Sequence, residues 1–275
     1  MISAVTINLA VAEERMQFQA AQLGYLGLHY ERISAIEAED APGLRPAAYW
    51  DTWERPLKDA EKACFLSHRA AWEKVVAGGK PLLILEDDAV LSDRVPHLLE
   101  KLSSATGIDL VTLETRGRKK FVAKAGHPDI LDLPIRRLYQ DRSGAAAYVL
   151  WPSGARKLLR RTEDKAGLAD AVICAAYDLA TYQADPACAL QIDRCTLYGI
   201  REPVATTSAI DAGEAPTAST GSGPTDTLAF KARRIRAQLR LGFHQLLKSP
   251  LAEHREIAVD PGDFSHLDRL TRLIA

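Results

Sequence analysis

The sequence predicts an α/β protein with a mainly parallel central sheet flanked by helices. The run from Pro81 to Leu85 is the strongest apolar stretch of the chain, and it directly follows a helical segment. A strand that is apolar throughout is covered on both faces, as in a parallel α/β sheet. Short apolar segments also alternate with helical ones near the N-terminus, which favours the same class.

The first half of the chain gives the clearest element pattern. Residues 2–9 are apolar and β-branched and predict a strand, a helical segment follows up to Leu23, and residues 30–36 predict a second strand. Residues 37–58 carry three prolines and little periodicity, so we expect a loop that could cover a site.

A long helix should precede the apolar run. Asp59 is a plausible N-cap, and Gly78 and Gly79 end the helix. Further strands are expected at residues 109–113 and 145–150, with a helix over 152–159.

Composition changes sharply towards the C-terminus. Residues 206–227 are rich in Ala, Thr, Ser, Gly and Pro, which is typical of a linker. We therefore expect a main domain over residues 1–210, a linker over 211–227 and a basic helical segment over 228–275.

Charge and cysteine usage exclude several classes. A net charge of −1 gives no reason to expect a nucleic-acid partner. No apolar run approaches the roughly 20 residues that span a bilayer, and no secretory signal pattern opens the chain, so we expect a cytoplasmic protein. The four cysteines lack zinc-site spacing and indicate buried free thiols.

Three consecutive carboxylates, Glu86, Asp87 and Asp88, follow the apolar strand. Ligands collect at the carboxyl ends of strands in open α/β sheets. Side chains alternate along a strand, so Glu86 and Asp88 should share one side and Asp87 the other. A hard divalent cation would compensate their mutual repulsion. The alternative is that these acids only cap a strand and start a solvated turn. A haloacid-dehalogenase-like phosphatase is disfavoured because Glu86 stands where its nucleophilic Asp would be.

Several short motifs, in order over roughly residues 2–210, resemble the family 25 glycosyltransferases, which include bacterial lipooligosaccharide galactosyltransferases. The motifs are Ile7-Asn8-Leu9 with Glu14-Arg15, Cys64-Phe65-Leu66-Ser67-His68 with Trp72, Leu85-Glu86-Asp87-Asp88, Gly144 to Tyr148 with Gly154-Ala155, and Asp170. Ala63 and Ala145 depart from the family's usual Gly and Thr, which bears on donor or acceptor preference more than on reaction class.

The resemblance implies a GT-A-like nucleotide-diphospho-sugar transferase fold. It also implies an inverting hexosyl transfer, with UDP-galactose the commonest donor, to a bacterial surface glycan such as lipooligosaccharide or lipopolysaccharide. Mn²⁺ is the cofactor that the family favours, and oxygen ligands also fit Mg²⁺.

The same resemblance assigns roles to the acidic motif. Asp88 is the expected direct metal ligand, and Glu86 is the second metal-site residue, supporting through water or the ribose. Asp87 is expected to orient the residues around the metal or to contact the nucleotide.

Other motif residues are candidates for donor binding. Asn8 and Arg15 lie between the first strand and its helix, where they could recognise the nucleotide, although Arg15 could equally be a surface charge. Ser67 and His68 are expected to line the donor side, while helical geometry excludes a Ser-His catalytic pair. His68 also lies on the apolar side of the predicted helix, and by that position alone it would be a core histidine.

The reaction needs a base for the acceptor hydroxyl. Asp170 is the first choice by its position in the family pattern, and Glu114, directly after a predicted strand, is the alternative. Tyr148 is expected to pack under the sugar, or equally to be a core aromatic.

The segment 228–248 combines apolar residues at helical spacing with Lys and Arg and contains no acid. It could contact the inner membrane, in keeping with a lipid-linked acceptor. The alternatives are a helix packed on the main domain with a solvated basic face, or a helical dimer contact.

Two other functions compete with the transferase. A non-catalytic sugar-nucleotide or glycan-binding module on the same fold would predict loss of the acids, which are present. A methyltransferase or dehydrogenase would predict a glycine-rich turn after the first strand, and the chain has Asn8-Leu9-Ala10-Val11 there.

Overall fold

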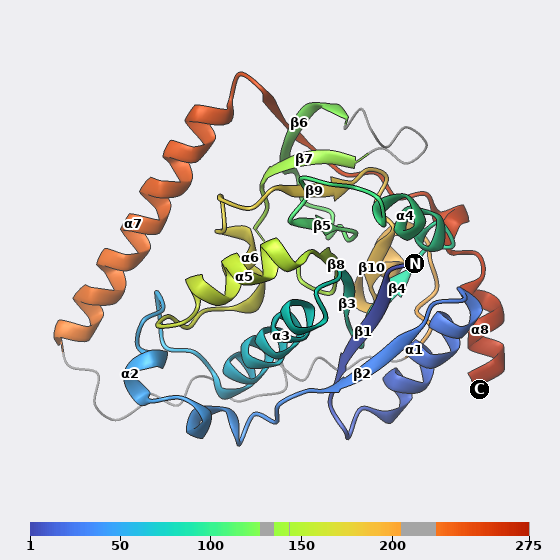
Figure 1. Cartoon of the computed structure of the whole chain (residues 1–275), viewed down its shortest axis with the longest axis horizontal. Helices are drawn as coiled ribbons and strands as arrows, with labels where there is room; N and C mark the ends of the chain where they lie inside the picture. Colours follow the sequence, from blue (N-terminus) through green and yellow to red (C-terminus); the bar gives the residue numbers. More distant parts are fainter. Residues whose placement is uncertain (127–134, 143, 205–223, 275) are drawn as a thin grey trace.

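A nine-stranded sheet forms the centre of the computed structural model, which describes residues 1–126, 135–142, 144–204 and 224–274 (Figure 1). Along the sheet the strands are β11 (Ala252–Arg255), β6 (Lys120–Gly126), β7 (Ile135–Gln140), β9 (Thr181–Ala184), β5 (Leu110–Thr112), β8 (Ala147–Leu150), β3 (Leu82–Glu86), β1 (Ser3–Asn8) and β2 (Tyr30–Ser34). A separate antiparallel pair joins β4 (Ala89–Leu91) to β10 (Ala189–Gln191).

Helices cover both faces of the sheet. The helices are α1 (Glu13–Tyr25), α2 (Ala47–Trp50), α3 (Asp59–Gly78), α4 (Val95–Leu102), α5 (Pro152–Arg161), α6 (Ala169–Cys174), α7 (Pro224–Lys248) and α8 (Leu267–Ile274). Short 3-10 turns η1 (Ala41–Leu44), η2 (Ile192–Tyr198) and η3 (Pro261–Phe264) complete the described elements.

Strand β3 shows why the apolar run is continuous. Leu83 and Leu85 join the core cluster that contains residues of α1 and α4. Ile84, between them, joins the opposite cluster with residues of α3 and α5. The prediction of a strand buried on both faces is therefore confirmed.

The prediction of a mainly parallel sheet is wrong, because the sheet is mixed. Strand β1 runs parallel to β2 and β3, and β5 runs parallel to β9. The remaining pairs, including β3 with β8 and β8 with β5, are antiparallel. Burial on both faces dictates an apolar strand whatever the direction of its neighbours, so the run predicted burial and could not predict orientation.

The predicted strands and helices of the first half are confirmed, with one difference at a helix border and one inside the predicted loop. Lys58 rather than Asp59 precedes α3, and the Glu61 carboxylate accepts a hydrogen bond from the Lys58 amide at 2.9 Å. The predicted loop 37–58 contains η1 and α2, so it is less irregular than the prolines indicated.

The chain after α7 returns to the domain. Strand β11 pairs with β6, and Phe264, Leu267 and Leu270 join a core cluster with Phe18 of α1. Most of the predicted linker lies outside the described residues, and the division at residues 210 and 228 stays a prediction. No described helix is both long and apolar enough to cross a membrane.

Candidate functional site

The site lies where β3 ends and turns into β4. Glu86 is the last residue of β3, and Asp87 and Asp88 form the turn. The three side chains lie in different environments, because neighbouring residues at a strand end point in different directions.

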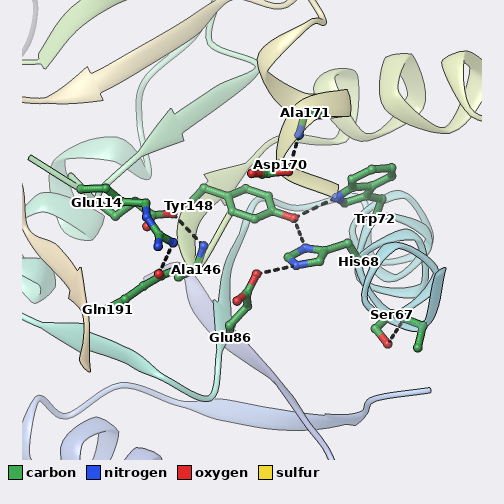
Figure 2. Close-up of polar contacts among 12 residues, drawn as sticks. Ser67, His68, Trp72, Glu86, Glu114, Ala146, Tyr148, Asp170, Ala171 and Gln191 are labelled. Carbon is green, nitrogen blue, oxygen red and sulfur yellow. Dashed lines mark hydrogen bonds and ion pairs between the residues drawn. The ribbon is translucent and has the colours of Figure 1, made fainter. Parts of the chain in front are cut away.

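His68 holds Glu86 through a chain of hydrogen bonds that begins inside the core (Figure 2). Trp72 Nε1 donates to the Tyr148 hydroxyl at 2.8 Å, and this hydroxyl lies 2.9 Å from His68 Nδ1. His68 Nε2 lies 3.0 Å from Glu86 Oε1. Because the indole can only donate, the tyrosine hydroxyl is left to donate to Nδ1, so Nε2 carries the proton that is donated to Glu86.

Asp87 is engaged on the other side of the turn. Asn8 Nδ2 donates to Asp87 Oδ2 at 2.8 Å, and Arg15 pairs with Asp87 Oδ1 at 3.1 Å. Gln19 Nε2 donates to the backbone oxygen of Asp87 at 3.1 Å. The end of β1 and the start of α1 are thus tied to the acidic turn.

Asp88 has a buried carboxyl oxygen, Oδ1, that lacks a hydrogen-bond partner among the described residues. Burial raises the pKa of Asp88 well above its usual range, and the charges of Glu86, Asp87 and Glu114 raise it further. An orphaned carboxylate oxygen among other carboxylates is the chemistry that a cation would compensate.

Glu114 lies just beyond β5 and is buried. Its Oε1 accepts a hydrogen bond from the Ala146 amide at 2.7 Å, whereas its Oε2 has no partner among the described residues. Burial raises the pKa of Glu114 to about 7, and the nearby Glu86 adds to the shift. Gly144 has a φ of +113°, and an added Cβ there would lie 2.8 Å from Glu114 Cδ, so this glycine leaves room for the carboxylate.

Asp170 is in the first turn of α6, and its Oδ1 accepts a hydrogen bond from the Ala171 amide at 2.7 Å. Burial raises its pKa, and the charge of Glu86 raises it further. Figure 2 shows Asp170 and Glu86 on either side of Tyr148. The structure therefore brings both candidate bases, Asp170 and Glu114, into the electrostatic field of the acidic turn.

Ser67 does not join this group. Its hydroxyl donates to the Ala63 carbonyl at 2.8 Å and accepts from the Ile36 amide at 2.9 Å. In Figure 2 it lies on the side of α3 away from Glu86. These contacts hold the segment after β2 against α3. Of Ser67 and His68, only His68 contacts the acidic turn.

A second set of metal-ligating atoms lies beside the first. Ligand atoms of Cys64, His68 and Glu86 lie within 4.8 Å of one another. Burial raises the pKa of the Cys64 thiol well above its usual range, and Glu86 raises it further, so the sulfur is protonated. The thiolate is the form that binds metal, which makes this set a weaker candidate than the carboxylates.

Three side chains support the site in ways that the sequence did not predict. Trp72 appeared only as a motif member and Tyr148 only as a residue under the sugar or in the core, yet both orient His68. Arg32 Nε donates to Asn8 Oδ1 at 2.9 Å. These partners are separated by 24 to 80 residues along the chain. The spacing within a single sequence holds no signal for such contacts.

Comparison with known proteins identifies the family. A sequence profile described as "Glycosyltransferase family 25 (LPS biosynthesis protein)" matches residues 1–173, more than half of the 275 residues. The chain belongs to glycosyltransferase family 25. The resemblance drawn from the motifs is thereby confirmed, and the family 25 match contains every carboxylate described above and excludes α7.

Among similar curated proteins are lacto-N-neotetraose biosynthesis glycosyltransferases of Neisseria. LgtE of Neisseria gonorrhoeae is 30% identical over 175 residues, covering 56% of this chain and 59% of LgtE. LgtB of the same species is 28% identical over 171 residues, covering 56% of this chain and 59% of LgtB. LgtB of Neisseria meningitidis serogroup B (strain ATCC BAA-335 / MC58) is 28% identical over 172 residues, covering 56% and 60%. The chain thus spans about three fifths of the length of these relatives.

Proposed function

We propose that this family 25 protein is an inverting glycosyltransferase. It moves a hexose, with galactose from UDP-galactose the first choice, to a bacterial surface glycan such as lipooligosaccharide or lipopolysaccharide. Family membership and the names of the Neisseria relatives support the reaction class. The observation that carries the proposal is the buried, unpaired oxygen of Asp88 among Glu86, Asp87 and Glu114.

The residues present fit a divalent cation. Asp88 and Glu86 would hold it, since Asp87 already has partners on both oxygens. Mn²⁺ or Mg²⁺ bound there would hold the donor diphosphate and neutralise the charge of the departing nucleoside diphosphate. His68 would keep Glu86 in place by donating from Nε2.

Asn8 and Arg15 support the donor side of the site. Both bind Asp87, so they fix the turn in the proposed GT-A-like arrangement and could also contact the nucleotide. Burial of His68 and Tyr148 keeps water away from one side of Glu86, which strengthens charge interactions there.

A carboxylate must accept the proton of the acceptor hydroxyl. The hydroxyl oxygen attacks the anomeric carbon, the bond from that carbon to the diphosphate oxygen breaks, and the proton moves to the carboxylate. Asp170 is the proposed base and Glu114 the alternative. A pKa of about 7 suits Glu114 for this task, and half-burial leaves Asp170 the more accessible of the two.

The test is calorimetric binding of UDP, with and without Mn²⁺, to wild type, Asp88→Ala and Cys64→Ser. We expect Mn²⁺-dependent binding that is lost in Asp88→Ala and kept in Cys64→Ser. Asp88 Oδ1 makes no hydrogen bond with the described residues that alanine would remove, so Asp88→Ala should stay folded, and its thermal unfolding without metal serves as the folding control.

Three results would contradict the proposal. Absence of UDP binding by folded wild type would remove the donor assignment. Loss of binding in Cys64→Ser alone would move the metal to Cys64, His68 and Glu86. The third result comes from incubating UDP-galactose and other UDP-sugars with glycan acceptors. UDP binding without sugar transfer would favour the non-catalytic sugar-nucleotide-binding module.

A further inference from the structure

Helix α7 turns six of its large apolar residues outward. The residues concerned are Leu228, Ile235, Leu239, Phe243, Leu246 and Leu247, which are between 56% and 71% exposed. Their spacing of four, seven and eleven residues puts them on one side of the helix, here named the outer face of α7. Single exposed apolar residues are ordinary, but a contiguous row of them marks an interaction surface.

The opposite side of α7 is fastened to the domain by polar and aromatic contacts. Arg233 donates to the Trp53 carbonyl at 3.1 Å near one end of the helix. Near the other end, His244 Nε2 lies 2.9 Å from the Tyr139 carbonyl oxygen, and its ring stacks on Tyr177 at 4.1 Å. Figure 1 shows α7 along one flank of the molecule. The helix is therefore held with its outer face away from the core.

The charge of α7 selects the partner. Residues 228–248 contain six Lys and Arg residues and no Asp or Glu. Lys231, Arg234 and Arg236 are exposed, and Lys231 and Arg236 lie beside the outer face by helical spacing. A second copy docked symmetrically on this face would set these cations against each other, which is unfavourable.

We propose that the outer face of α7 docks the protein on an anionic lipid bilayer. The apolar side chains enter the boundary between headgroups and acyl chains, and the flanking cations pair with lipid phosphates. The surface goes beyond the proposed sugar transfer and does not depend on it. One alternative drawn from the sequence was a helix packed on the main domain with a solvated basic face. The helix does pack on the domain, but its solvent-facing side is apolar as well as basic.

The test is flotation of the full chain with vesicles of phosphatidylglycerol and phosphatidylcholine, and with vesicles of phosphatidylcholine alone. Wild type should float with the mixed vesicles, and added salt should weaken the binding because it screens the charges. Leu239→Ser with Phe243→Ser should lower the partition coefficient at least about tenfold. Lys231→Gln with Arg236→Gln should lower it on the mixed vesicles only.

The matched control is Leu197→Ser, which changes a leucine that is 63% exposed on η2 and should leave flotation unchanged. All substituted side chains are exposed, so circular dichroism and thermal unfolding should match wild type. Wild type that fails to float with the anionic vesicles overturns the proposal, as does equal flotation of the serine variant. A dimer in light scattering that the serine variant abolishes would instead assign the face to a second copy.

Discussion

At the scale of single residues, the site depends on how hydrogen-bond donors are ordered around His68. Trp72 has one donor and no acceptor, so it sets the direction of the tyrosine hydroxyl and through it the protonated nitrogen of the imidazole. The imidazole that donates from Nε2 holds Glu86 by its Oε1 atom. His68 is therefore both a buried core residue and a residue that contacts the acidic turn.

Glu114 should make folding stability depend on pH. Its pKa of about 7 exceeds the ordinary 4.5, so the folded protein holds this proton more tightly than the unfolded chain does. The resulting stabilisation is complete below pH 4.5 and is lost as the pH rises through 7. Between pH 5 and pH 8 we expect a loss of roughly 2 to 3 kcal/mol from this group.

Glu114→Gln removes that titration and keeps an oxygen for the Ala146 amide. Urea unfolding at pH 5 and pH 8, without divalent metal, should show a smaller decrease in stability for the variant than for wild type. Glu100→Gln, at an exposed position on α4, is the control and should follow wild type. Parallel decreases for Glu114→Gln and wild type would rule out a buried, proton-binding Glu114.

At the scale of elements, the site depends on how closely α5 approaches β5. Gly154 lies in the first turn of α5, and a Cβ there would lie 2.4 Å from the Asp109 carbonyl oxygen. That carbonyl also accepts a hydrogen bond from the Trp151 amide at 3.0 Å. The close approach fixes the end of β8 against the start of β5, the strand that leads to Glu114.

Gly154→Ala should therefore shift α5 and lower the free energy of unfolding by about 1 to 3 kcal/mol. Gly24→Ala is the matched control, because no atom lies within 4 Å of a Cβ added there in α1. Alanine in place of a helical glycine should leave stability unchanged or raise it by up to about 1 kcal/mol. Chemical denaturation of both variants measures the difference, and equal effects would refute the close approach.

At the scale of the whole molecule, the residues after α7 complete the core next to the N-terminal helix. Phe264 is buried with Leu267 and Leu270 against Phe18 of α1 and Val90 of β4. Since α1 also carries Arg15 and Gln19, the C-terminal segment supports the helix that contacts the acidic turn.

Phe264→Ala should lower the free energy of unfolding by about 3 to 5 kcal/mol, the usual range for truncating a buried phenylalanine. Leu251→Ala, in the same segment but 59% exposed, should change it by no more than about 0.5 kcal/mol. Thermal or urea unfolding distinguishes the two variants. A small effect of Phe264→Ala would show that the C-terminal segment does not share the core of the domain.

The sequence by itself determined the family, the main strands and helices of the first half, and the acidic turn after β3. These features depend on local order along the chain: apolar runs, glycine stops and short motifs at fixed spacing. Strands β4, β6, β7 and β9 to β11 were missed, because they are short or mixed in character and their burial depends on distant neighbours.

Only the tertiary structure decided the strand directions, the partners of each carboxylate and the side of α7 that faces outward. Glu86, Asp87 and Asp88 are adjacent in sequence, yet they differ in environment because His68, Asn8 and Arg15 reach them from different elements. The periodicity of α7 predicted an amphipathic helix, and periodicity does not say which face meets the domain. Polar contacts at both of its ends hold the apolar side towards solvent, and contacts between distant residues are what a linear pattern does not record.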